Sequence, residues 1–173
     1  MASTIGRLIE ANDWLAASRA IRMALHSDRQ NHWLLTSLAL TYYEEKDYRR
    51  ALEYDLVALA EAPTCPLVLW NYAGTLQMID QRQEALKIYR ALIRRGTKEI
   101  AFDDCGEGLG WARGLVADCH YRIAGCHRRA RHPALAIKSL EKHLGLRGPG
   151  CRSIYQLRDV KQELEKLRTA TRR

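Results

Sequence analysis

The stretch DYRRALEYDLVALAEAP, residues 47–63, decides the fold, because a weaker copy of it, DWLAASRAIRMALHSDR, begins 34 positions earlier at residue 13. Both copies open with Asp followed by an aromatic residue, and both place an alanine four residues later, Ala17 and Ala51. A third alanine, Ala85, continues the spacing. A spacing of this length, in segments rich in Ala, Leu and Arg, predicts one helical unit that recurs along the chain.

Two full copies of a longer pattern follow from this spacing. Residues 32–65 carry Leu35, Leu38, Ala39, Tyr42, Ala51, Asp55, Ala58 and Pro63. Residues 66–99 carry Leu69, Tyr72, Ala73, Leu76, Ala85, Tyr89 and Leu92, with Thr97 in the place of the proline. This pattern resembles the tetratricopeptide repeat, a helix-turn-helix unit of about 34 residues.

A third and weaker copy, residues 115–148, appears once about 17 extra residues are allowed. It carries Ile123, Ala124, His127, Ala136 and Leu140, with its turn at Pro133. The extra residues, 97–114, contain four glycines and, from Asp103 to Glu107, three acids, and we expect them to form an inserted loop. Two hypotheses for this loop stay open: its acids meet the arginines of the third repeat, or the loop projects and contacts a partner.

The ends of the chain complete the expected architecture. Residues 1–31 are predicted to form an N-terminal half-repeat. Residues 151–173 are predicted to form an amphipathic capping helix with a basic tail, because apolar residues from Ile154 to Leu167 recur at steps of three and four. The resemblance therefore implies an all-α protein with one domain, residues 1–173, in which stacked helix pairs form a right-handed solenoid.

Composition limits the environment and the class of partner. No apolar run approaches the roughly 20 residues of a membrane span, and the first residues lack a secretory signal pattern, so we expect a cytoplasmic protein. The five cysteines form an odd set without disulfide or zinc-ribbon spacing. Of the charged residues, 111–173 hold fifteen Lys/Arg against five Asp/Glu, whereas the preceding part has no positive excess. Such a concentration of charge attracts acidic protein surfaces or nucleic acid.

In the tetratricopeptide family, the first helix of each repeat lines a concave groove that binds partners. The resemblance implies the following partner-binding residues: Trp33, Leu40 and Tyr43 from the first repeat, Trp70, Asn71 and Gln77 from the second, and Tyr121, Arg122, Arg128 and Arg129 from the third. Aromatic residues and arginines are frequent binding anchors, so the implied partner has an acidic surface or segment. Two alternatives stay open: Trp33 and Tyr43 can pack on the N-terminal half-repeat, and the arginines can form a solvated helix end.

The candidates for chemistry are few, and we expect neither a cofactor nor a metal ion. Cys119, His120, Cys126 and His127 suggest zinc, but neighbouring residues on one helix point about 100 degrees apart and the four cannot converge. The glycines of residues 97–114 miss the phosphate-binding fingerprints. Cys105 lies among acids that disfavour its thiolate, so we predict that the protein is not an enzyme.

The resemblance thus implies a non-enzymatic module that binds an acidic protein. Small proteins of this kind include bacterial cytoplasmic adaptors and immunity proteins that neutralise a toxin. Two alternatives are RNA binding through the basic C-terminal third, and a secretion chaperone.

Overall fold

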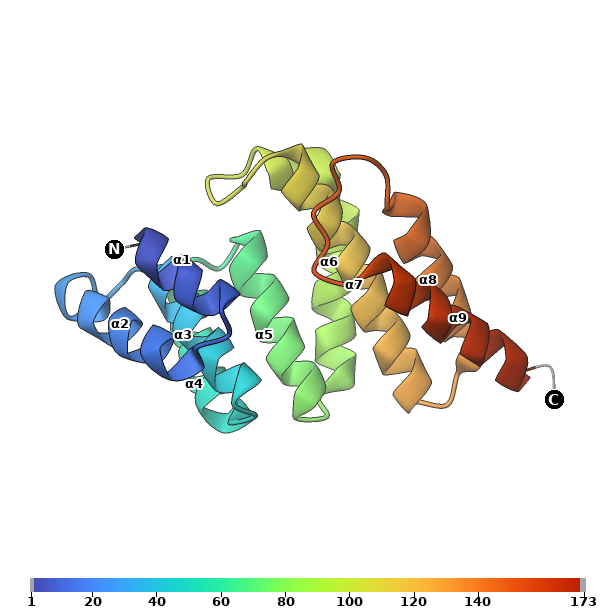
Figure 1. The fold of residues 1–173 in the computed structure, drawn as a ribbon, viewed down its shortest axis with the longest axis horizontal. Coiled ribbons are helices and arrows are strands. Elements are labelled where there is room, and N and C mark those ends of the chain that lie inside the picture. The colour runs from blue at the N-terminus through green and yellow to red at the C-terminus, as the bar shows by residue number, and fades with distance from the viewer. Residues whose placement is uncertain (1, 172–173) are drawn as a thin grey trace. The chain divides into compact units, whose positions relative to one another are not determined.

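The structure of the chain is a computed structural model that describes residues 2–171, and every regular element in this range is an α-helix (Figure 1). The predicted all-α fold is therefore confirmed. None of the described helices is both long and apolar enough to cross a lipid bilayer. The chain divides into two compact units, residues 1–81 and residues 82–173.

Unit 1 contains five helices, in which each helix packs against the next and α3 also packs against α5. Their bounds are α1 Ala2–Glu10, α2 Trp14–Ser27, α3 His32–Glu44, α4 Tyr48–Glu61 and α5 Pro66–Met78. The contact of α3 with α5 brings together the first helices of the first two predicted repeats.

Unit 2 contains four helices, again packed in sequence order. Their bounds are α6 Arg82–Ala101, α7 Leu109–Arg129, α8 Pro133–Leu146 and α9 Leu157–Thr171. The two helices of the second predicted repeat, α5 and α6, therefore belong to different units.

The repeat is visible in the backbone as one residue with positive φ in each helix-turn-helix turn. Asn12, Lys46, Asp80 and Arg131 have φ of 56°, 65°, 67° and 58°. In each turn the next residue donates its N–H to the carbonyl five residues before it, as Asp47 does to Tyr42 at 2.9 Å. The first three turns keep the spacing predicted from the sequence, and the turn at Arg131 comes later by the length of the insertion. The backbone therefore repeats with the same period as the sequence.

The extra residues before the third repeat form mainly helix, which corrects the predicted loop of residues 97–114. Compared with α4, α6 is six residues longer, and α7 is eight residues longer than α3. Only residues 102–108 connect α6 to α7. Gly96, with φ of 80°, interrupts α6, but the helix resumes at once because Ile100 and Ala101 bury their side chains. Gly108 then starts α7 with φ of 85°.

Small side chains at equivalent positions allow the helices to approach closely. Ala17, Ala51, Ala85 and Ala136 are each 0% exposed, as the sequence pattern predicts. Asp13 and Asp47 cap α2 and α4 by accepting the N–H of the third residue after them, both at 3.1 Å. The aspartates that open each repeated stretch therefore fix the start of the helix, while the alanines fix its distance from the next one.

Asp55 links α4 to α5 inside unit 1. Its side chain is 1% exposed, and its Oδ2 accepts a hydrogen bond of 2.5 Å from the hydroxyl of Thr75. Burial raises the pKa of Asp55 to about 7, although the bond from Thr75 favours the charged form. A carboxyl with a higher pKa in the folded state stabilises the fold at low pH, and this contribution is lost as the pH rises to about 7.

We therefore predict that Asp55→Asn makes the protein more stable at alkaline pH. The amide keeps the shape of the carboxyl but cannot ionise, so the stability of the variant relative to wild type should rise by roughly 2–3 kcal/mol between about pH 5 and pH 8. Urea denaturation at several pH values measures this difference, with the exposed Glu53→Gln on the same helix as the control. A difference between Asp55→Asn and wild type that does not change with pH would contradict the account.

Candidate functional site

The segment between α8 and α9, residues 147–156, crosses the first half of α7; we call it the strap. Its backbone lies so close to α7 that only glycine fits beneath it. A Cβ atom at Gly114 would lie 2.0 Å from the carbonyl oxygen of Arg152, and one at Gly110 would lie 2.4 Å from that of Gly150. The N–H of Arg152 donates to the carbonyl of Gly110 at 3.0 Å. The close approach of the strap thus explains why positions 110 and 114 of the glycine-rich stretch are glycine.

Asp118 holds the strap to α7. Its side chain is 3% exposed and accepts two hydrogen bonds, from the hydroxyl of Ser153 at 2.5 Å and from the N–H of Ile154 at 3.0 Å. Burial raises the pKa of Asp118 to about 6, while the bonds from Ser153 and Ile154 oppose this shift. A buried carboxyl with two donors from one segment fixes the position of that segment.

A second set of contacts to the strap involves His143 of α8 and Arg147, the residue that directly follows α8. The buried His143 has Nδ1 at 2.9 Å from the carbonyl of Ala117 and Nε2 at 3.2 Å from Arg147. Burial lowers the pKa of His143, so the geometry assigns a neutral ring that donates to the carbonyl and accepts from Arg147. Arg147 also donates to Ser153 and to the carbonyl of Tyr155, at 3.0 and 2.7 Å.

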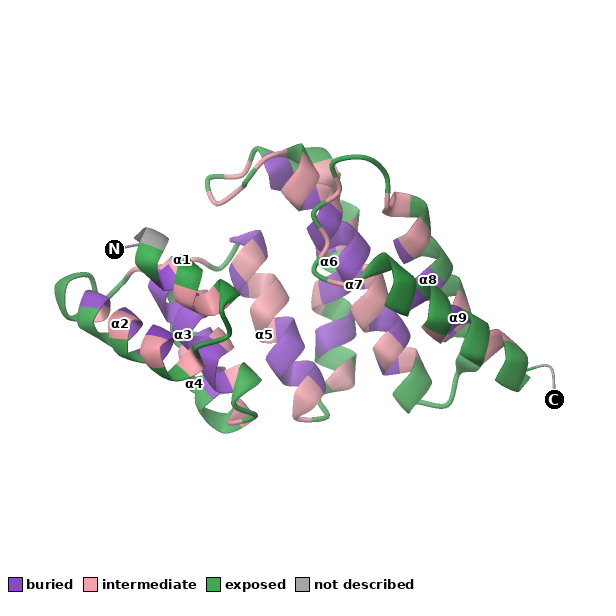
Figure 2. Ribbon diagram, in the orientation of Figure 1, coloured by how far each residue is buried: buried purple, intermediate pink, exposed green. Residues whose placement is uncertain are grey.

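The strap and α9 together cover the face of α7 that carries three of the predicted site residues. The Tyr121 hydroxyl donates to Glu163 of α9 at 2.9 Å, and Arg128 forms an ion pair with the same carboxylate. The ring of Tyr121 stacks on that of Tyr155 with centroids 3.8 Å apart, and the Arg122 guanidinium lies 5.9 Å from the Tyr155 centroid. In Figure 2 most of α9 is exposed, because only Val160 and Leu164 are buried in it.

Glu163 thus supplies an internal carboxylate to Tyr121 and Arg128, two of the residues for which the sequence predicted an acidic partner. Burial, together with the hydrogen bond to this carboxylate, raises the pKa of Tyr121 to about 12. Arg128 and Arg129 are both exposed at the end of α7. Sequence spacing does not reveal the contact with Glu163, because it joins residues 42 and 35 positions apart.

The acids of the predicted loop bind other arginines of unit 2. Asp103 forms an ion pair with Arg95 of α6, and Glu107 lies 3.8 Å from Arg152 of the strap. Burial would raise the pKa of Asp103, but bonds from the Cys105 N–H and from Arg95 lower it. These are not the contacts of the first hypothesis for this loop, which paired its acids with Arg122, Arg128 and Arg129, and contact of the loop with a partner stays a prediction.

In unit 1, the predicted site residues of the first repeat lie on α3 and are half-buried. Trp33 packs against the core of unit 1 and lines a cavity of about 280 Å³ together with Ile5 and Asn31. Tyr43 packs against the same core and meets Tyr48 edge to face, with centroids 5.5 Å apart. Leu40 is half-buried as well. Trp33 thus lies beside Ile5 of α1 and Ala24 of α2, as the packing alternative expects, whereas the ring contact of Tyr43 is with Tyr48 of α4.

The predicted residues of the second repeat lie on α5. Trp70 and Asn71 are half-buried, and the Asn71 amide donates to the carbonyl of Leu67 at 3.0 Å. Gln77 is only 6% exposed. Trp70 and Asn71 therefore offer more surface to a binding partner than Gln77 does.

The candidates for zinc lie on different sides of α7. Cys119 and Cys126 are buried, and burial raises the pKa of both thiols, whereas His120 and His127 are half-buried and line a pocket towards α6 and α8. Thiols and imidazoles on one helix thus face different surroundings, in line with their expected angular separation.

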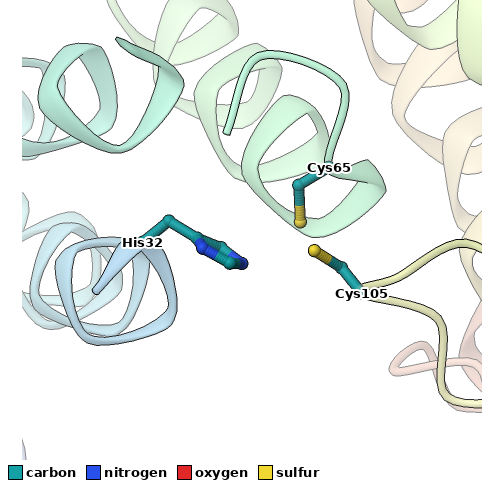
Figure 3. A group of neighbouring side chains, drawn as sticks. All are labelled: His32, Cys65 and Cys105. Carbon is teal, nitrogen blue, oxygen red and sulfur yellow. The ribbon is translucent and has the colours of Figure 1, made fainter. Parts of the chain in front are cut away.

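One further pair of possible metal ligands lies in unit 1. An imidazole nitrogen of His32, at the start of α3, lies within 4.8 Å of the sulfur of Cys65, which precedes α5 (Figure 3). Two ligands are fewer than the four of a structural zinc site. Cys105, also drawn in Figure 3, belongs to unit 2, where its N–H donates to Asp103 at 2.9 Å.

Comparison with protein-family models and with curated protein sequences finds no match. Solved structures do match, over nearly the whole chain. MamA from Desulfovibrio magneticus has a TM-score of 0.68 and 14% identity, covering 98% of this chain and 82% of that one. A second MamA structure has a TM-score of 0.64 and 19% identity, with 95% and 82% covered. A tetratricopeptide repeat protein from Parabacteroides merdae has a TM-score of 0.60 and 16% identity, with 97% and 59% covered.

This chain has the tetratricopeptide-repeat fold. The resemblance found in the sequence is confirmed at the level of fold, and at these identities the comparison shows the fold alone. The strap beneath which Gly110 and Gly114 lie was not expected from the repeat pattern.

We predict that Gly114→Ala loosens the strap. The added methyl group would overlap the carbonyl of Arg152, so the strap must move and unit 2 should lose about 1–3 kcal/mol of stability. Urea denaturation measures the loss, and trypsin cleavage after Arg147 and Arg152 should become faster. Gly145→Ala in α8, where an added Cβ meets no atom within 4 Å, is the matched control and should not accelerate cleavage. Equal cleavage rates for both variants would refute the close packing described.

Proposed function

We propose that the protein is a non-enzymatic interaction module that binds an acidic segment of another protein. The tetratricopeptide-repeat fold supports this proposal because stacked repeats present extended surfaces for binding. The residues proposed to carry binding lie on the first helices of the repeats, α3 and α5 in unit 1 and α7 in unit 2.

The observation that carries the proposal is the contact of Tyr121 and Arg128 with Glu163. A phenol donor and a guanidinium two turns apart on α7 bind one carboxylate, which is the chemistry needed to bind Asp or Glu of a partner. Arg128 is 51% and Glu163 20% exposed in this ion pair, which places its contribution near the upper end of the range of about 0–1 kcal/mol for surface pairs. A partner carboxylate could therefore displace Glu163 at small cost, and Arg129 next to it would add a second cation.

Aromatic residues of unit 1 would supply the apolar part of binding. Trp33, Tyr43 and Trp70 are half-buried, so each keeps surface for a partner, and Trp33 and Tyr43 also pack against the core of unit 1. Fixed aromatic rings lose little conformational entropy on binding and are common hot spots.

Within this proposal, an adaptor or an immunity protein that neutralises a toxin is the role we favour, and a secretion chaperone is the alternative.

RNA binding is a second candidate function, and the specific observation in its favour is the excess of Lys/Arg in residues 111–173. Several of these cations are engaged, however: Arg128 with Glu163, Arg147 with the strap and Arg168 with Glu141 and Glu165. We therefore keep RNA binding as an outcome of the test.

We predict that removing the internal carboxylate strengthens binding of an acidic peptide. Glu163→Ala should bind a fluorescein-labelled peptide of alternating Glu and Ala about fivefold more tightly than wild type, because no internal group competes. Arg128→Glu combined with Arg129→Glu should abolish binding. Fluorescence anisotropy measures both, and Arg158→Glu combined with Lys161→Glu on α9 is the control with the same change in charge.

Three results would contradict the proposal. Weaker binding by Glu163→Ala would mean that Glu163 supports the surface rather than competing for it. Equal losses in the control would mean that net charge alone attracts the peptide. Tighter binding of an RNA of the same length, with a steep dependence on salt, would assign the basic residues to nucleic acid.

A further inference from the structure

A basic pocket lies in unit 2 between α6, α7 and α8, on residues that the proposed partner site does not use. Its volume is about 290 Å³. Its lining residues are Arg90, Ile93, Arg94, His120, Ile123, His127, Leu135, Lys138, Ser139 and Lys142. We call it the basic pocket.

The charged groups around the basic pocket all have the same sign. Arg90 and Arg94 stand one helical turn apart on α6, and Lys138 and Lys142 stand one turn apart on α8. No carboxylate among the described residues lines the pocket. Like charges at this spacing destabilise a helix, and two such pairs facing one cavity repel each other further.

The same four cations, all of them exposed, have no counter-charge among the described residues, unlike several other basic residues of unit 2. Within residues 2–171, Arg90, Arg94, Lys138 and Lys142 form no ion pair and no hydrogen bond. In contrast, Arg95 pairs with Asp103, Lys87 with Glu84 and Arg168 with Glu141. An anion in the pocket would supply the charge compensation that the fold itself leaves out.

Two imidazoles form the inner polar part of the pocket. His120 and His127 stand two turns apart on α7, with Ile123 between them, and both are half-buried. Burial and the nearby Lys142 lower the pKa of His120 to about 4, and burial and Arg90 lower that of His127. Both rings are therefore neutral near pH 7 and can donate an N–H to an anion, while a bound anion would favour their protonation.

We propose that the basic pocket binds a small molecule with a terminal phosphate, such as a phosphate monoester or pyrophosphate. Four cations from two facing helices suit a group with two or more negative charges, which a terminal phosphate carries and an internal phosphodiester does not. The compact cavity suits a small ligand, since binding along a nucleic-acid backbone needs an extended basic track. Ile93, Ile123 and Leu135 give the pocket an apolar wall for the rest of such a molecule.

This proposal goes beyond protein binding and does not depend on it. Neither Tyr121 nor Arg128 lines the basic pocket, and none of its residues comes from α3 or α5. Phosphate binding can therefore fail while acidic-peptide binding succeeds, and the reverse.

The test is calorimetric titration of the full chain with pyrophosphate at constant ionic strength. We expect saturable binding with Kd below about 1 mM for wild type and at least a tenfold weaker Kd for Lys138→Gln combined with Lys142→Gln. Arg158→Gln combined with Lys161→Gln, two exposed cations of α9, removes the same charge outside the pocket and should bind like wild type. Because the replaced lysines repel their neighbours, the pocket variant should also unfold at a higher temperature than wild type without ligand.

Nuclear magnetic resonance measures the pKa of His120, which non-specific attraction of the anion to the protein surface would not change. Pyrophosphate should raise the pKa of His120 in wild type, while the ring signals of the exposed His26 should not shift. Equal weakening of binding in the pocket and control variants, or an unchanged His120 titration, would overturn the proposal. Two further ligands, ribose 5-phosphate and an RNA without a terminal phosphate, should be titrated in the same way. If the RNA binds as tightly as pyrophosphate and ribose 5-phosphate, the proposal is overturned in favour of phosphodiester binding.

Discussion

The position of α9 depends on the hydrogen bonds that the buried Asp118 accepts from Ser153 and Ile154. These bonds hold the strap on α7, and the missing side chains of Gly110 and Gly114 leave the space for its backbone. Once the strap is fixed there, Tyr155 stacks on Tyr121. An ordinary capping helix needs only an apolar stripe to cover the last repeat. Here the capping helix is also fixed by polar contacts of the strap that leads into it.

This arrangement has a consequence for the proposed binding of an acidic partner. Part of the α7 surface that the repeat pattern assigns to a partner is occupied by the chain itself, through Glu163 on Tyr121 and Arg128. An internal carboxylate lowers the affinity for external carboxylates but raises the selectivity, because only a ligand with additional contacts displaces it. The exposed contact with Arg128 makes this competition weak, whereas the buried contact of Asp118 with the strap is not readily displaced.

The repeat could be predicted from the sequence because it is a local property. The repeat period, the capping aspartates and the buried alanines each follow from helix geometry and close packing, and the positive φ values at Asn12, Lys46 and Asp80 keep the same period. The extent of α6 and α7 could not be predicted, because a glycine-rich stretch is typical of a loop. Gly110 and Gly114 lie in a helix here because the strap passes too close to α7 for any larger residue, and this contact is not visible in the local sequence. The contacts of Asp118 and Glu163 join residues at least 35 positions apart, which no local pattern encodes. The basic pairs of the pocket were visible in the sequence at a spacing of four, but their convergence depends on how α6 and α8 pack around α7.

The measurement that tests the account most directly is amide hydrogen exchange in the wild-type protein, followed residue by residue with nuclear magnetic resonance. The N–H of Ile154 lies outside any helix, and its acceptor is the carboxylate of Asp118. If the strap is held as described, this amide should exchange as slowly as amides in the middle of α7, through unfolding of unit 2. Exchange of Ile154 at the rate of an unprotected loop amide would show that the strap is not fixed on α7, and would remove the basis for an internal competitor at Tyr121 and Arg128.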